Sequence, residues 1–282
     1  MKYVVLIPIY NDREALKLLI QNINDVIEGV NAEISLVVIN DASSQQIIDN
    51  YPNIENIQST LMKMGGLVEK SLFDAAEALV NSDVDLAKLV RENDQIIDDL
   101  EEEINSQTAR LIALRSPTAT DLRDALSFIK IASNLERIGD YGKNMAKRSL
   151  VMKPSSINEQ GCRSLRRMTK DVIVMMNNGL DAYIRKDVDL AESVILQDQD
   201  IDQHYNALFR EFLTFMMENP KNITTCMHLH FIAKNIERMG DHVTSIAEQV
   251  VFLTTGERPS EPREKDDRTS YDVKMSLDTK NE

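Results

Sequence analysis

Residues 131–140 read IASNLERIGD, and residues 232–241 read IAKNIERMGD. Seven of these ten positions are identical, at an offset of 101 residues. Earlier in the chain, DVDLA at residues 83–87 recurs at residues 187–191, at an offset of 104. Matched segments that recur in the same order at nearly the same spacing indicate an internal duplication. The sequence therefore contains one structural unit twice.

The duplicated region, from about residue 55 to residue 254, has a helical pattern throughout. Apolar residues recur every three or four positions, as at Leu61, Met64, Val68 and Leu72, which is typical of helices packed in a bundle. Turn-forming residues interrupt this pattern near residues 81–82, 116–117, 153–156, 186–187 and 219–220. The sequence thus predicts six helices, arranged as two tandem three-helix bundles over residues 55–152 and 157–254.

The two flanking segments differ from this region. Continuous apolar runs at residues 4–9 and 34–39 are typical of buried strands, and a helical stripe lies between them at residues 13–28. Residues 1–50 therefore predict a short β-α-β segment. Residues 256–282 are rich in charge, Pro and Ser without an apolar period, which predicts a disordered tail. The expected fold class is mainly all-α.

Composition restricts the class of partner and the compartment. The formal net charge is −14, so the surface repels phosphate backbones and nucleic-acid binding is not expected. No apolar run reaches the roughly 18 to 20 residues of a membrane span, and we expect neither membrane insertion nor a signal peptide. The two cysteines, Cys162 and Cys226, form no metal or disulfide pattern. This usage fits a reducing compartment and predicts a cytoplasmic protein.

Each copy carries a pair of carboxylates with unfavourable local energetics. Glu136 lies four residues before Asp140, and Glu237 lies four residues before Asp241. At that helical spacing the two carboxylates share a face and repel each other. A Gly precedes each Asp, and Gly inside a helix costs about 1 kcal/mol relative to Ala. A cation between the carboxylates, with another helix packed closely over the Gly, would offset both effects.

A second helix in each copy supplies further carboxylates. Asp94 and Asp98 are matched by Asp198 and Asp202, again four residues apart. Clusters of carboxylates on facing helices resemble the metal sites of helical bundles, and oxygen ligands suit Mg²⁺, Mn²⁺, iron or zinc. The predicted metal ligands are Glu136, Asp140, Asp98, Glu237, Asp241 and Asp202. The alternative is a solvated acidic face that Arg137, Lys143 or Arg238 neutralises. No nucleophile elbow, phosphate-binding loop or HExxH motif is found, so no catalytic residues and no enzyme activity are expected.

The segments ERIGDY at residues 136–141 and ERMGDH at residues 237–242 resemble the paired ExxxD motifs of the PhoU family. MGGLVE at residues 64–69 and LRSP at residues 114–117 also resemble that family, and the likeness covers about residues 57–254. The resemblance implies two tandem three-helix bundles, metal clusters on the ExxxD helices and a homodimer. It also implies a cytoplasmic accessory protein of the phosphate-specific ABC transporter. Such a protein restrains phosphate uptake and the phosphate regulon, by linking the transporter and its ATPase to a sensor histidine kinase.

The first 48 residues resemble a different family. LIPIYND at residues 6–12 and VVINDAS at residues 37–43 are similar to the opening of a family 2 glycosyltransferase, where such residues help to hold a nucleotide-sugar. About 50 residues cannot build that fold, and we expect an inactive fragment. Two alternatives to a phosphate regulator remain at this stage. One is a glycosyltransferase-related fusion acting through this segment, and the other is a purely structural helical scaffold.

Overall fold

The computed structural model describes residues 2–9, 21, 33–40, 53–115, 117, 119–152 and 156–257. It divides the chain into two compact units, Met1–Pro52 and Asn53–Glu282. In the first unit, β1 (Lys2–Ile9) and β2 (Glu33–Asn40) pair in parallel, with Lys2 opposite Glu33. These two strands span the apolar runs at residues 4–9 and 34–39. The helix predicted between them lies outside the described residues apart from Gln21, as does nearly all of the predicted tail.

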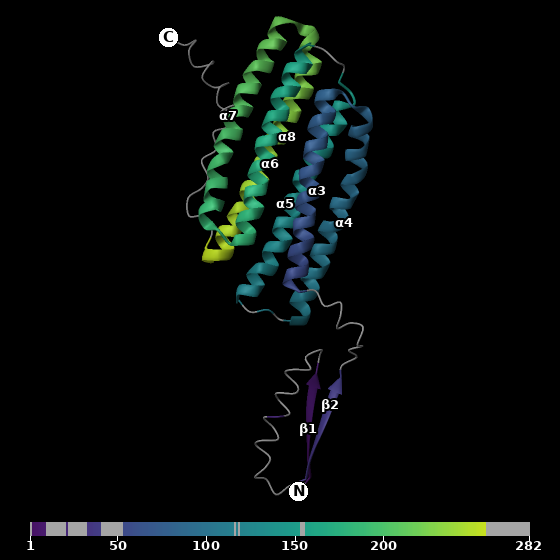
Figure 1. Cartoon of the computed structure of the whole chain (residues 1–282), viewed down its shortest axis with the longest axis vertical. Coiled ribbons are helices and arrows are strands. Elements are labelled where there is room, and N and C mark those ends of the chain that lie inside the picture. Colours follow the sequence, from purple (N-terminus) through teal and green to yellow (C-terminus); the bar gives the residue numbers. More distant parts are fainter. Residues whose placement is uncertain are drawn as a thin grey trace, which may run out of the picture. The chain divides into compact units, whose positions relative to one another are not determined.

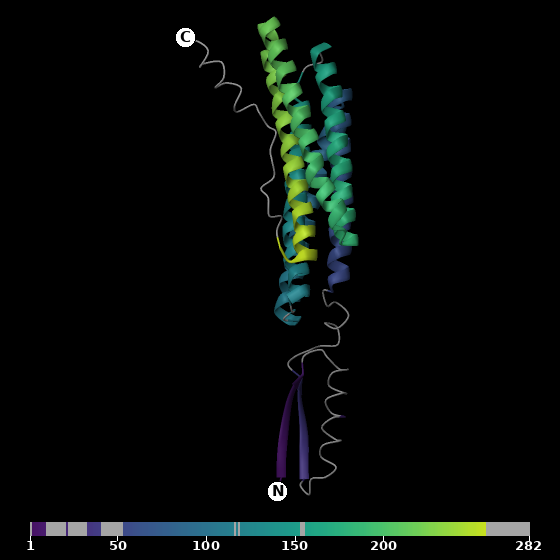
Figure 2. The ribbon, with the colours of Figure 1, turned by 90° about the vertical axis from the view of Figure 1, so that its left-hand side faces the viewer.

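The described part of the second unit contains the six predicted helices, which run side by side in both views (Figure 1 and Figure 2). They are α3 (Ile54–Asn81), α4 (Val84–Arg115), α5 (Ala119–Ser149), α6 (Ser156–Arg185), α7 (Val188–Glu218) and α8 (Ile223–Thr255). A short 3-10 turn, η1 (Pro220–Asn222), precedes α8. Every break between helices falls where the sequence places a turn. The expectation of a mainly helical chain is confirmed.

The apolar stripes form the core of the helical unit. On α3, Leu61, Met64, Val68 and Leu72 are all fully buried. On α8, the stripe that begins at Ile232 is buried in the same way. Burial of apolar surface supplies most of the stability of such helices, because helices in proteins are stabilised more by packing of an apolar face than by helix propensity. Both cysteines also lie in this core as free thiols.

Equivalent aspartates fix the start of α4 and of α7. The Oδ1 atom of Asp83 accepts a hydrogen bond from the backbone N–H of Leu86 at 3.0 Å. Asp187 accepts one from the backbone N–H of Leu190 at the same distance. These contacts satisfy amide groups that the first turn of a helix leaves without partners. The repeated DVDLA segment is thus a helix start with its cap.

The two copies meet through equivalent helices. Within each copy all three helices contact one another, and between copies α3 packs against α6 and α5 against α8. Tyr141 and His242, which occupy equivalent positions of the repeat, lie with ring centroids 5.8 Å apart. The Nδ1 atom of His242 is 2.8 Å from the Oδ1 atom of Asn134. Each of these contacts joins equivalent helices of the two copies. The copies are therefore related by an approximate twofold axis within one compact six-helix unit.

None of the described helices combines the length and the apolar character that crossing a bilayer requires.

Candidate functional site

The first acidic cluster lies between α4 and α5. Asp94 on α4 is buried, and the Lys143 ammonium group on α5 donates a hydrogen bond to its carboxylate. The same ammonium group lies 3.7 Å from Asp140. Asp98 and Glu136 are half-buried in the same region. The structure thus places Asp98 and Glu136 each within electrostatic reach of Asp140, and it places the buried Asp94 near Asp98.

Crowding of negative charge perturbs this cluster. Burial, the charge of Asp140 and a hydrogen bond shared with that residue raise the pKa of Glu136 to about 7, although Arg137 opposes the shift. Burial and the neighbouring Asp94 also raise the pKa of Asp98. The hydrogen bond to Asp94 raises the pKa of Lys143, which therefore stays charged. A group of carboxylates that resists full ionisation is suited to attract a cation.

The second acidic cluster lies between α7 and α8 and is more deeply buried. Asp198, Asp202 and Glu237 are at most 3% exposed, and Asp241 is half-buried. Lys234 lies 2.9 Å from the Oε1 atom of Glu237. Burial raises the pKa of Glu237, as do the charges of Asp241 and Asp202, while Lys234 lowers it. The Oε2 atom of Glu237 is buried and accepts no hydrogen bond within the described part of the chain.

The glycine of each motif lets the second acidic helix approach. A Cβ atom added at Gly139 would lie 3.2 Å from Ile97 on α4 and 3.9 Å from the Oδ1 atom of Asp94. One added at Gly240 would lie only 2.7 Å from the Oδ1 atom of Asp198 on α7. The expectation that another helix packs closely over each glycine is confirmed. The close approach is what places the α4 and α7 carboxylates beside the ExxxD pairs.

The lysine of each cluster comes from a different position of the repeat. Lys143 of the first copy corresponds to Thr244 in the second, and Lys234 of the second corresponds to Ser133 in the first. Lys143 was expected from the sequence as a possible counter-charge, whereas Lys234 was not. An alignment of the two copies would have identified both lysines, because each copy has one lysine, absent from the other copy, within one helical turn of its Glu or Asp. The two clusters are therefore similar in their acids and different in their cations.

The chemistry of the donor atoms favours a metal ion, whereas the positions of the described side chains do not form a metal-binding group. Only carboxylate oxygens converge in both clusters, which suits hard cations. Across residues 53–257, apart from the undescribed residues 116, 118 and 153–155, no three Asp, Glu, His or Cys side chains are grouped closely enough to hold a metal ion. The carboxylates and lysines form ion pairs instead. The clusters are also not a solvated face, because most of their carboxylates are buried or half-buried.

Comparison with known proteins places this arrangement in a family. The family model described as "PhoU domain" matches residues 61–149 and 165–250, once for each copy of the repeat. A phosphate-specific transport system accessory protein PhoU homolog of Rhizobium meliloti is 46% identical over 210 residues, which are 74% of this chain and 89% of that protein. A homolog of the same description from Caulobacter vibrioides is 42% identical over 212 residues, 75% of this chain and 92% of the other.

Solved structures agree with the sequence matches. The crystal structure of PhoU from Pseudomonas aeruginosa superimposes with a TM-score of 0.67 at 38% identity, covering 72% of this chain and 97% of that one. A phosphate transport system regulatory protein PhoU from Streptococcus pneumoniae also gives a TM-score of 0.67, at 29% identity, with 74% and 98% of the two chains covered. The family match and these relatives give no support to the glycosyltransferase resemblance of the first 48 residues. The duplicated ExxxD helices, the six-helix fold and these matches show that the chain belongs to the PhoU family.

Proposed function

We propose that this protein is a cytoplasmic regulator of phosphate uptake, acting as an accessory protein of a phosphate-specific transport system. The observation that carries the proposal is the PhoU domain match over both copies, together with relatives that bear that description. The chain spans most of the length of these relatives, so the likeness covers nearly the whole of each of them. We expect regulation through protein partners rather than catalysis.

The finer part of the proposal concerns partners. The protein contacts the ATPase of a phosphate ABC transporter, links its status to a sensor histidine kinase, and acts as a homodimer. In this role it lowers expression of phosphate-responsive genes when phosphate is plentiful. The family resemblance supports this part.

Deletion of the gene tests the regulatory role. Expression of a phosphate-responsive promoter should rise in high phosphate in the deletion strain, and the intact gene should restore repression. A second deletion that removes the sensor kinase should abolish the rise, because the signal passes through the kinase. Unchanged expression in both low and high phosphate after the first deletion contradicts the proposal.

We also propose that both acidic clusters bind metal ions. In the first cluster Glu136, Asp140 and Asp98 would hold the ion, and in the second Glu237, Asp241 and Asp202 would do so. A bound cation would cancel the mutual repulsion of the carboxylates. The crowded carboxylates, the raised pKa of Glu136 and the buried Oε2 atom of Glu237 support the proposal. Magnesium, manganese, iron and zinc all fit these oxygen donors.

Metal binding would require Lys143 and Lys234 to release the carboxylates with which they form ion pairs. Lys143 contacts Asp94 and Asp140, and Lys234 contacts Glu237, so each lysine competes with a cation for one or two carboxylates. Binding would therefore include a side-chain rearrangement in which the lysine leaves its partner. Because the carboxylates must be ionised, the affinity for metal should fall as the pH drops.

Metal content and thermal stability test this part together. The purified protein should retain Mg, Mn, Fe or Zn by elemental analysis and should melt at a lower temperature after treatment with chelator. The variant Glu136→Ala plus Asp140→Ala should lose metal and part of the chelator effect. A control with two exposed acids removed from α4, Asp85→Ala plus Glu92→Ala, should keep both. A wild-type protein without metal, whose melting ignores chelator, contradicts the proposal.

A further inference from the structure

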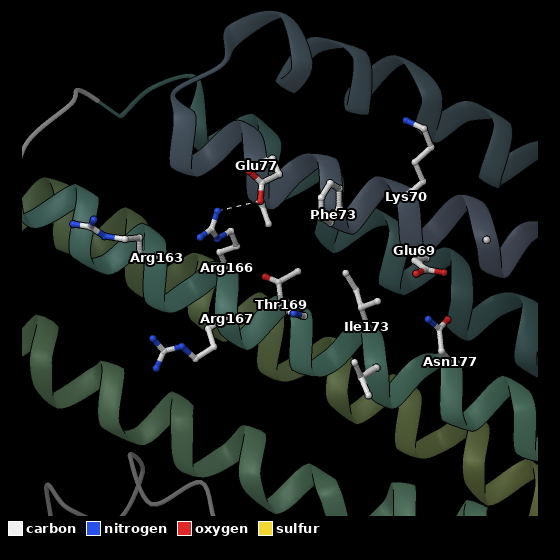
Figure 3. A pocket seen from close by; sticks show the side chains of 14 residues that line it. Glu69, Lys70, Phe73, Glu77, Arg163, Arg166, Arg167, Thr169, Ile173 and Asn177 are labelled. Atoms are coloured by element: carbon white, nitrogen blue, oxygen red, sulfur yellow. Dashed lines mark hydrogen bonds and ion pairs between the residues drawn. The ribbon is translucent and has the colours of Figure 1, made fainter.

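A groove about 800 Å³ in volume lies between α3 and α6, the two helices that carry none of the acidic cluster residues. The two helices are antiparallel, because Glu77 pairs with Arg166 at 3.3 Å and Gly65 lies against Leu180. Figure 3 shows the groove from close by, with that ion pair at one end. We call it the α3/α6 groove.

The length of the groove matches a short helix. Its α3 wall extends from Gly66 to Glu77 and its α6 wall from Arg163 to Asn177. At a rise of 1.5 Å per residue, these walls are about 17 and 21 Å long. That is the length of three to four turns of a partner helix.

Large apolar side chains are exposed along the groove. Phe73 on α3 is 57% exposed and Val174 on α6 is 50% exposed. Figure 3 shows the ring of Phe73 projecting from α3 toward Thr169 and Ile173 on α6. Exposed apolar side chains gathered beside a hollow mark a surface that a partner covers.

The groove is basic although the chain is acidic. Five basic and two acidic side chains line it, in a chain whose formal net charge is −14. Arg166 pairs with Glu77, and Arg163 with Glu159 at 3.6 Å. Arg167 and Lys170 are exposed and form no ion pair with any acidic residue in the described part of the chain, so their charges are available to a partner.

We propose that the α3/α6 groove binds an acidic amphipathic helix of a partner protein, with its apolar stripe on Phe73 and Val174 and its carboxylates opposite Arg167 and Lys170. A helix is the fitting element because α3 and α6 offer no open sheet edge to which a strand could pair. An acidic helix is expected because Arg167 and Lys170, which have no acidic partner in the described part of the chain, would attract its carboxylates and would repel a basic helix. The inference rests on the proposed function only in that an accessory protein has a protein partner.

A designed peptide tests the groove directly. The probe is a fluorescein-labelled helical peptide of about 18 residues with a Leu stripe flanked by Glu, and its counterpart carries Lys at every Glu position. Binding is measured by fluorescence anisotropy with the purified full-length protein. The acidic peptide should bind the wild type, and Arg167→Glu plus Lys170→Glu should weaken it about tenfold or more. The Lys peptide should show the opposite preference.

Matched variants separate the groove from general charge effects. Lys88→Glu plus Arg91→Glu makes the same charge change at two exposed positions of α4, and it should leave binding of the acidic peptide unchanged. Phe73→Ser should weaken binding about fivefold through loss of apolar contact. Circular dichroism establishes that each variant is folded. Equal binding of both peptides, or binding that ignores Arg167 and Lys170, overturns the proposal.

Two other occupants give distinct results. If a second copy of this chain fills the groove, Val174→Asp will convert a dimer into a monomer in sedimentation velocity. If an anionic membrane fills it, vesicles containing phosphatidylglycerol will retain the wild type and lose Arg167→Glu plus Lys170→Glu. Either result overturns the assignment to an acidic helix. The peptide assay needs only purified protein, so its failure leaves the regulatory proposal standing, and failure of the promoter test leaves the peptide result standing.

Discussion

At the scale of single residues, the glycine of the second motif leaves almost no room for a side chain. A Cβ atom at Gly240 would lie 2.7 Å from Asp198, whose carboxylate is only 1% exposed and has little room to move. A Cβ atom at Gly139 would meet the flexible end of Ile97 at 3.2 Å, and one at Gly66 would meet nothing within 4 Å. These three helical glycines therefore differ in how much space the surrounding atoms leave for a Cβ atom.

We predict that these surroundings decide the sign of a Gly→Ala change. Gly66→Ala should stabilise the protein by about 0.5 to 1 kcal/mol, because Ala favours the helix and no atom opposes it. Gly240→Ala should destabilise it by about 1 to 3 kcal/mol through overpacking, and Gly139→Ala should lie between the two. Denaturation followed by circular dichroism measures this, since the chain has no Trp. A Gly240→Ala protein as stable as Gly66→Ala would refute the close approach.

The pKa of Glu136 gives a second prediction at this scale. Burial and Asp140 raise the pKa of Glu136 from 4.5 to about 7, so the folded state holds a proton that the unfolded chain releases near pH 4.5. The contribution of Glu136 to folding stability is fully present below pH 4.5 and is lost as the pH rises through about 7. In chelator, Glu136→Gln should therefore show a shallower fall in stability over this window than the wild type.

The control for this titration is Asp85→Asn, whose side chain is 95% exposed. Its stability curve should run parallel to that of the wild type. Some fall will remain in Glu136→Gln, because the pKa values of Asp98 and Glu237 are also raised. A wild-type slope in Glu136→Gln would show that Glu136 titrates normally.

At the scale of the helices, the two copies end their first helix in the same way. Ser82 and Lys186 occupy equivalent positions after α3 and α6, with φ angles of 53° and 52°. This left-handed conformation is costly for any residue with a Cβ atom, and Gly is the usual choice at such a helix end. Ser82 is exposed, whereas Lys186 also lies 3.2 Å from the carboxylate of the nearly buried Asp124.

We predict that glycine has different effects at these equivalent positions. Ser82→Gly should stabilise the protein by about 0.5 to 1 kcal/mol by relieving the backbone. Lys186→Gly should stabilise less or destabilise, because it also leaves the Asp124 carboxylate without its cation. Midpoints of urea denaturation compare the two variants, with Lys186→Met as a control that removes only the charge. Equal stabilisation at both positions would mean that the Asp124 contact contributes nothing.

At the scale of the whole molecule, contacts between the copies make the six helices one unit. Equivalent helices of the two copies pack directly on each other, α3 on α6 and α5 on α8. A cavity made in one copy should therefore lower the stability of the other. Phe212 on α7 is 1% exposed and serves as the test position.

We predict that Phe212→Ala, at a cost of about 3 to 5 kcal/mol, reduces amide hydrogen-exchange protection in α4 of the first copy as well as in α7. The physical reason is that neither three-helix set keeps its apolar faces covered when the other unfolds. Exchange read by mass spectrometry resolves the two helices. Exposed Phe73→Ala is the control and should leave protection in both unchanged. Loss confined to α6, α7 and α8 would show that the copies unfold independently.

The sequence by itself determined the helices and the duplication. The stripe of Leu61, Met64 and Val68 and the cap at Asp83 depend on spacings of three or four residues, which any helix imposes on its own chain. The repeat then placed Glu136 with Asp140, and its counterpart pair, on corresponding helices. These are local properties, and they predicted the six helices and the acids of both clusters.

Only the tertiary structure decided which distant side chains meet. Asp94 and Lys143 are 49 positions apart, and Glu77 and Arg166 are 89 apart. No periodicity relates such residues, because their separation depends on how far two helices slide and turn as their side chains interlock. Packing between helices therefore set the lysine partners and formed the α3/α6 groove, whereas spacing along each helix had already set the elements and their buried faces.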